Sequence, residues 1–94
     1  MTAPRLRSRR EWAALAERAE FRDLAGKFTV DADGGLTAMF LTPGPRFYVK
    51  RCFERFARAR GFVLTSVRRE PPPLFHPFTG ERNDVYSIRL ERRQ

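Results

Sequence analysis

Residues 46–61, RFYVKRCFERFARARG, carry the clearest structural pattern in the chain. Four apolar side chains recur there at the spacing i, i+3, i+4, i+7, which is that of one face of an α-helix. They are Val49, Cys52, Phe53 and Phe56. Arg51, Arg55 and Arg58 fall on the opposite side, and Gly61 suits the left-handed conformation that ends many helices. The stretch predicts an amphipathic helix with its apolar face on a core and its basic face outward.

The stretches on both sides of this helix show the period of two that β-strands have. Residues 27–42, KFTVDADGGLTAMFLT, predict a hairpin, because DADGG supplies residues that accept positive φ at a turn. Residues 62–70, FVLTSVRRE, and residues 84–93, DVYSIRLERR, each predict a further strand. Residues 71–83 between them, PPPLFHPFTGERN, are too rich in proline to join a ladder, so we expect a semi-rigid projecting loop.

A first helix is expected near the N-terminus. Ser8 and Glu11 have the spacing of a capping box, which places the first helical residue at Arg9. The apolar stripe of this helix falters near Glu20, so we expect a bend there before Gly26 ends it.

The expected order of elements is α-β-β-α-β-β, which predicts an α+β fold. We expect a four-stranded antiparallel sheet with two helices on one face. Moving the last strand to the front gives β-α-β-β-α-β, so the architecture predicted is a circularly permuted ferredoxin-like sandwich. A chain of 94 residues has the size of one domain. We therefore expect a single domain over residues 1–94, with a basic arm at residues 1–8 and the proline-rich loop at residues 71–83.

The composition is strongly basic. Nineteen lysines and arginines against eleven acids give a formal charge of +8, and most of the basic residues are arginine. The planar guanidinium pairs bidentately with phosphate or carboxylate, so the bias favours such partners. A GC-rich genome is an alternative explanation for the choice of arginine over lysine, but it does not explain the net excess of charge.

The cysteine content and the hydropathy pattern bear on location. Cys52 is the only cysteine, which excludes an internal disulfide and suits a reducing compartment. No apolar stretch approaches the roughly 18 residues that a membrane span needs, and the basic N-terminus does not lead into an apolar signal core. We therefore expect a cytoplasmic protein with no membrane partner.

The surplus positive charge concentrates in the N-terminal arm and in residues 46–60. Such patches are typical of phosphate binders, because each neutralised phosphate releases condensed counterions. The sequence has neither an RNA-recognition-motif aromatic signature nor a G-x-x-G loop of the KH type. We therefore predict a small basic nucleic-acid-binding protein that contacts the phosphate backbone without strong sequence specificity; the alternative is a solvated basic face with no ligand. The predicted binding residues are Arg7, Arg9, Arg10, Arg46, Lys50, Arg51, Arg55 and Arg58.

The loop at residues 71–83 supports a second hypothesis. Leu74, Phe75 and Phe78 are candidate apolar anchors for a protein partner, because rigid proline-rich segments dock on aromatic grooves. In this version the protein is a phage- or mobile-element-type adaptor or inhibitor that binds an acidic surface of a larger complex. The alternative is a connection folded over the sheet edge. Met39 and Leu41 face away from the predicted helices, which leaves a homodimer open.

Catalysis is not predicted. His76 is the only histidine, and Cys52 lies on an apolar helix face, so a buried structural thiol is the better interpretation. Asp31 and Asp33 begin like a calcium loop, but the later ligands are missing, which favours a turn. No metal-ligand spacing and no cofactor motif occurs, so we expect no metal and no cofactor.

Overall fold

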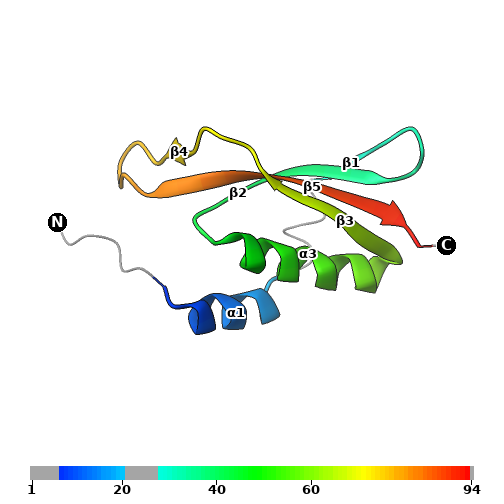
Figure 1. The fold of residues 1–94 in the computed structure, drawn as a ribbon, viewed down its shortest axis with the longest axis horizontal. Coiled ribbons are helices and arrows are strands. Elements are labelled where there is room, and N and C mark those ends of the chain that lie inside the picture. The colour runs from blue at the N-terminus through cyan, green and yellow to red at the C-terminus, as the bar shows by residue number, and fades with distance from the viewer. Residues whose placement is uncertain (1–6, 21–27, 94) are drawn as a thin grey trace.

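The computed structural model describes residues 7–20 and 28–93 of the chain. These residues form an α+β fold in which helices lie beneath an antiparallel sheet (Figure 1). The elements are α1 (Arg9–Glu17), β1 (Phe28–Val30), β2 (Leu36–Thr42), α3 (Arg46–Arg60), β3 (Phe62–Arg69), β4 (Leu74–Phe75) and β5 (Arg82–Arg92).

The sheet has the strand order β1-β2-β5-β3, and every pair in it is antiparallel. The last strand, β5, lies in the middle, so that Ile88 is opposite Ala38 on one side and Val67 on the other. Strands β1 and β3 form the two edges among the described residues. The predicted α+β class and the antiparallel sheet are confirmed.

The sheet has five strands, not the four that the sequence analysis predicts. The additional strand, β4, lies in the loop expected to be too proline-rich for a ladder; Leu74 pairs with Asn83 and Phe75 with Arg82. Three of the four prolines in this loop are consecutive at residues 71–73, so the two residues after them keep their N–H groups and resume pairing before Pro77. Strands β3, β4 and β5 thus build one long hairpin that runs past the start of α3 (Figure 1).

Helices α1 and α3 lie on the same side of the sheet, and α1 packs on α3, which separates it from the sheet (Figure 1). Helix α1 begins at Arg9 as predicted, with Ser8 Oγ accepting a hydrogen bond from the Glu11 N–H at 3.2 Å. Helix α1 ends at Glu17, with Arg18 as its C-cap, so it stops before Glu20, where the sequence analysis expects only a bend. The expected end at Gly26 lies outside the described residues. The permuted ferredoxin-like arrangement stays a prediction.

The core lies between α3 and the sheet. All four apolar residues expected on the inward face of α3 are buried, which confirms that prediction. The ring of Phe28, from β1, stacks on Phe56 with centroids 4.9 Å apart, and its edge contact with Phe53 is at 5.6 Å. Burying one such side chain contributes about 1.5–3 kcal/mol. The core therefore fixes the rotation of α3, and with it the directions in which the basic residues of this helix point.

Candidate functional site

Two basic residues of α3 that were predicted to contact phosphate are turned toward α1. The carboxylate of Glu17 lies 3.9 Å from Arg51 Nη1 and 3.8 Å from Arg55 Nε. Arg55 also donates a hydrogen bond from Nη1 to the backbone carbonyl of Ala16 in the last turn of α1. These guanidinium groups therefore join the two helices, and Glu17 offsets part of their charge.

The other predicted basic residues of the helices lie in different surroundings. Arg46 donates from Nε to the carbonyl of Val67 at 3.2 Å, and Lys50 Nζ lies 3.8 Å from the Glu54 carboxylate. Arg10 and Arg58 are exposed. The structure thus divides the predicted set among several environments instead of aligning it as one strip.

Four arginines converge on a cavity of about 720 Å³ at the start of α3. They come from four segments: the residues before α1, α1 itself, the first turn of α3, and the end of β3. They are Arg7, Arg9, Arg46 and Arg69. Three aromatic residues and the turn at residues 43–45 form the rest of the wall. The aromatic residues are Trp12, Phe47 and Tyr86. We call this cavity the arginine cavity.

Two of these arginines lie over aromatic rings. The guanidinium carbon of Arg7 is 5.3 Å from the ring centre of Trp12, and that of Arg9 is 4.8 Å from the ring centre of Phe47. Cation–π contacts of this kind are worth about 0.5–1 kcal/mol at exposed sites. They hold the guanidinium groups at the cavity wall.

Asp84 supplies the carboxylate among the described residues that line the cavity. Its side chain is 19% exposed, and its Oδ1 accepts a hydrogen bond from Arg82 Nε at 3.3 Å. Since this acid already has a cationic partner, the four arginines keep an excess of positive charge in the cavity.

The wall of the cavity is tightly packed around Gly44. A Cβ atom on this residue would lie 2.5 Å from Tyr48 Cδ2 and 3.0 Å from Trp12 Cζ3, so only glycine fits between the two rings. Thr42 Oγ1 accepts a hydrogen bond from the Gly44 N–H at 3.0 Å, and Tyr86 donates from its hydroxyl to the Gly44 carbonyl at 3.2 Å. Burial raises the pKa of Tyr86. These contacts fix the turn that precedes α3.

Of the residues that line this cavity, the sequence analysis predicts only Arg7, Arg9 and Arg46 as binding residues. Trp12, Tyr86 and Arg69 are among those it does not single out. A signal for Arg69 was available, because side chains two apart in a strand share a face. Val67 is buried against the helix side, so Arg69 places a charge on the face of β3 that is expected to be apolar.

The predicted partner-binding residues Leu74, Phe75 and Phe78 lie in the β4–β5 hairpin and are 52%, 62% and 87% exposed. The hairpin is ordered by its own contacts. His76 Nδ1 accepts hydrogen bonds from the N–H groups of Phe78 and Thr79, at 3.2 and 3.1 Å. The apolar side chains are therefore presented on an ordered arm and not folded back over the sheet.

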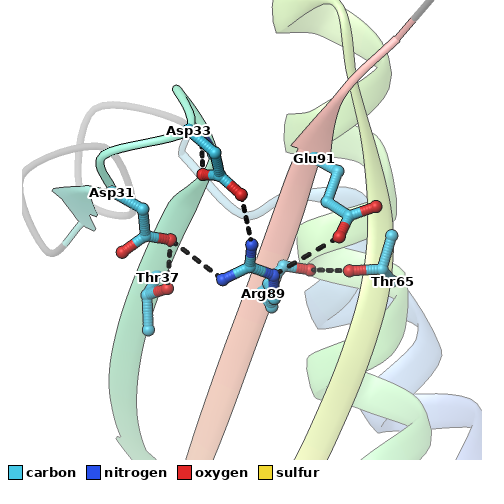
Figure 2. A network of polar contacts seen from close by, with 7 residues as sticks. Asp31, Asp33, Thr37, Thr65, Arg89 and Glu91 are labelled. Carbon is cyan, nitrogen blue, oxygen red and sulfur yellow. Dashed lines mark hydrogen bonds and ion pairs between the residues drawn. The ribbon is translucent and has the colours of Figure 1, made fainter.

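The carboxylates of the turn at residues 31–35 are engaged by the protein itself (Figure 2). Arg89 Nη1 lies 3.1 Å from Asp31 Oδ2, and Arg89 Nη2 lies 2.8 Å from Asp33 Oδ2. A hydrogen bond from the Gly35 N–H, together with Arg89, holds the pKa of Asp33 below its usual value. No group of three or more metal-ligating side chains occurs within residues 7–20 and 28–93. Arg89 of β5 therefore holds this turn in place through its two carboxylates.

Cys52 and His76 are not brought together. Cys52 is 1% exposed in the core, whereas His76 lies in the hairpin turn. Burial raises the pKa of the Cys52 thiol, which disfavours the thiolate.

Comparison of the chain with protein-family models, with curated proteins and with solved structures finds no match. Within the described residues, neither helix combines the length and the apolar character that a bilayer crossing requires. The function of the protein is therefore inferred from its own residues and their contacts.

Proposed function

We propose that the protein binds nucleic acid through its phosphate backbone, without strong sequence specificity, and that the arginine cavity is the centre of the contact. The observation that carries this proposal is the convergence of four arginines from separate segments on one cavity whose acid is already paired. A folded domain gains little from bringing like charges together unless an anion joins them, because like charges repel.

The arrangement suits phosphate for a geometric reason. Arginine offers a planar fork of donors that matches two phosphate oxygens, and the fork survives partial stacking on a ring. The aromatic side chains beside the arginines can in addition stack on bases, a contact worth about 1–3 kcal/mol per base and tolerant of sequence. A single strand, whose bases are accessible, fits this combination better than a duplex.

Salt dependence gives the first test. If four arginines each neutralise a phosphate of a single strand, the slope of log K against log salt is about −3, from a contribution of about −0.7 per phosphate. Fluorescence anisotropy with a labelled oligo-dT and a labelled oligo-rU at several salt concentrations measures it. Absence of binding at low salt removes the proposal.

Charge reversal gives the second test. Arg9→Glu, Arg46→Glu and Arg69→Glu, combined, are expected to abolish binding to both oligonucleotides. The matched control is Arg60→Glu with Arg92→Glu and Arg93→Glu, which makes the same change in net charge at the C-terminal ends of α3 and of β5. Equal losses in the two triple variants would mean that only the net charge matters and would contradict a localised site.

A second candidate function rests on the hairpin. Leu74, Phe75 and Phe78 present exposed apolar surface on an ordered arm, as an adaptor or inhibitor of the phage or mobile-element kind would need. This hypothesis predicts protein partners in a pull-down that survive nuclease treatment and disappear with Phe75→Ser and Phe78→Ser. A loss of all captured protein after nuclease treatment would favour the nucleic-acid proposal.

Three further predictions stay with this proposal. We propose a cytoplasmic location from the single buried cysteine, and a permuted ferredoxin-like fold from the central position of β5.

A homodimer would cover the outer face of the sheet, where Met39 and Leu41 are 57% and 50% exposed. Sedimentation at several protein concentrations tests the dimer.

A further inference from the structure

Strand β3 is an edge of the sheet, and no other strand of the described residues pairs with its outer side. In an antiparallel ladder, residues alternate between those bonded to the partner strand and those whose N–H and C=O groups point away from it. The Glu70 N–H donates to the Val85 carbonyl at 2.7 Å, which fixes this alternation. The backbone groups of Val67 and Arg69 therefore point to the open edge.

The contact of Arg46 agrees with this assignment. Its Nε reaches the Val67 carbonyl from α3, at 3.2 Å, which requires that this carbonyl face away from β5. Since Nε makes this bond, the two terminal nitrogens of the guanidinium remain for a ligand beside the strand. No carboxylate of a described residue lies within ion-pair distance of Arg46.

A groove of about 410 Å³ runs along this edge, between α3 and β3. Residues 64–68 form one wall, and Arg46 and Lys50 form the other. We call it the edge groove. It thus combines the outward backbone groups of Val67 and Arg69 with a helix that lies beside them, which is the arrangement that receives an extended peptide as an added strand. The Val67 carbonyl already accepts from Arg46, so an added strand shares this acceptor or displaces that side chain.

The charge of the edge groove is positive. Lys50 and Arg68 each have one ion pair, at 3.8 Å, with Glu54 and Glu70 respectively. The lysine and arginine side chains are 57% and 75% exposed, and pairs so exposed contribute about 0–1 kcal/mol. An incoming carboxylate can therefore displace or join these partners at small cost.

The open length of β3 is defined at both ends. A bulge shifts the register between Leu64 and Ser66, and the prolines at residues 71–73 interrupt the ladder after Glu70. Bulges and prolines are two of the features by which proteins protect edge strands from pairing with other chains. Between them the stretch at residues 66–69 keeps regular pairing with β5 and is the place where a further strand fits.

We propose that the edge groove binds an acidic, extended segment of a partner protein, which adds to the sheet as a strand beside β3. A second copy of this chain is disfavoured as the occupant, because its own β3 would bring Arg68 and Arg69 to the same basic groove. A nucleic acid would match the charge but has no alternating N–H and C=O groups for the ladder. The edge groove shares the side chain of Arg46 with the arginine cavity, and the backbone edge that would pair with a peptide includes Arg69, which also lines that cavity.

The test uses a fluorescein-labelled peptide of alternating glutamate and valine, EVEVEVE, with KVKVKVK as the matched basic control. We expect anisotropy to show binding of the acidic peptide only. Two further peptides carry methyl groups on the backbone nitrogens, one at the glutamates and the other at the valines. Alternate residues of an added strand direct their N–H groups toward β3, so one of these two peptides should lose binding and the other should keep it. Lys50→Glu with Arg68→Glu is expected to weaken binding at least about tenfold.

Backbone pairing is tested directly by hydrogen exchange. The amides of Val67 and Arg69 are expected to exchange rapidly in the free protein and to become protected when the peptide is added. Arg69→Pro removes one edge donor, and Arg69→Ala removes the same side chain but keeps the N–H. Proline should weaken peptide binding and alanine should not, with thermal unfolding used to confirm that both variants fold.

Several results would overturn the proposal. Binding of EVEVEVE without protection of the Val67 and Arg69 amides would exclude strand addition. Protection that rises with protein concentration in the absence of peptide would assign the edge to a second copy. Protection by oligo-dT, but not by the peptide, would assign the groove to nucleic acid. Arg9→Glu separates the two sites, since it should weaken oligo-dT binding and leave the peptide unaffected.

Discussion

Arg55 of α3 donates a hydrogen bond to the backbone carbonyl of Ala16 in α1, across 39 positions of sequence. Ala16 is fully buried, and its carbonyl accepts both from this guanidinium and from the Ala19 N–H, the latter at 3.3 Å. The same guanidinium lies 3.8 Å from Glu17. A residue that the sequence places on a phosphate-binding face thus holds the two helices together.

Replacing Arg55 by alanine is therefore expected to destabilise the protein. Hydrogen bonds to charged groups contribute about 1.5–3 kcal/mol, and the change leaves the Ala16 carbonyl with only its backbone donor, the Ala19 N–H at 3.3 Å. Urea unfolding measures the loss. Arg58→Ala removes the same side chain from an exposed position one turn further along the helix and should change the free energy of unfolding by less than about 0.5 kcal/mol. Equal effects in the two variants would contradict the assigned role.

Gly44→Ala is expected to destabilise the turn before α3. The new Cβ would overlap Tyr48 and press on Trp12, whose rings are 4.8 Å apart between centroids. Overpacking of this kind costs about 1–3 kcal/mol. In a Tyr48→Ala background the same change should cost less, because the obstructing ring is gone. Thermal or urea unfolding of the four proteins completes this double-mutant cycle, and strict additivity would show that the overlap is relieved elsewhere.

Helix α3 shows which structural features can be predicted from its sequence and which cannot. The helical period of Val49, Cys52 and Phe53 is local, so it predicts which face of α3 is buried without knowledge of the rest of the chain. The partner of Arg55 depends on where α1 lies, which no local pattern gives.

The prediction that residues 71–83 contain no strand is wrong for a different reason. The prolines suppress pairing only at their own positions, and the two residues after them resume the ladder. The arginine cavity is the extreme case of dependence on the whole fold, because its four guanidinium groups come from four segments.

The contact between Arg89 and Asp33 predicts a pH dependence at the acid end. The pKa of Asp33 is lowered from its ordinary value of 3.8, first by the Gly35 N–H and then by Arg89. A group whose folded pKa is depressed adds stability that is fully present above its unfolded pKa and is lost as the pH falls through the folded pKa. Urea unfolding of the protein and of Asp33→Asn should therefore differ at pH 6, and the difference should shrink as the pH falls below 3.8 through the folded pKa. A difference that persists at low pH would mean that the carboxylate charge is not the cause.

Tyr48 predicts the opposite behaviour at the alkaline end. Burial, with a smaller contribution from the neighbouring Cys52 thiol, raises the pKa of Tyr48 to about 12 from an ordinary value of 10.0. The neutral phenol is thus favoured in the folded state, so its contribution to stability is complete below pH 10 and falls as the pH rises toward 12. Absorbance of tyrosinate at 295 nm, measured at pH 10.5, should show little ionisation in the folded protein. In 8 M urea at the same pH it should show strong ionisation, because an unfolded tyrosine has a pKa of about 10. Tyr48→Phe leaves only Tyr86 as a chromophore and assigns the late step, because the amplitude between pH 10 and pH 12 should fall by about half. Full ionisation of both tyrosines near pH 10 in the folded protein would show that the ring of Tyr48 is open to solvent, contrary to its packing against Trp12.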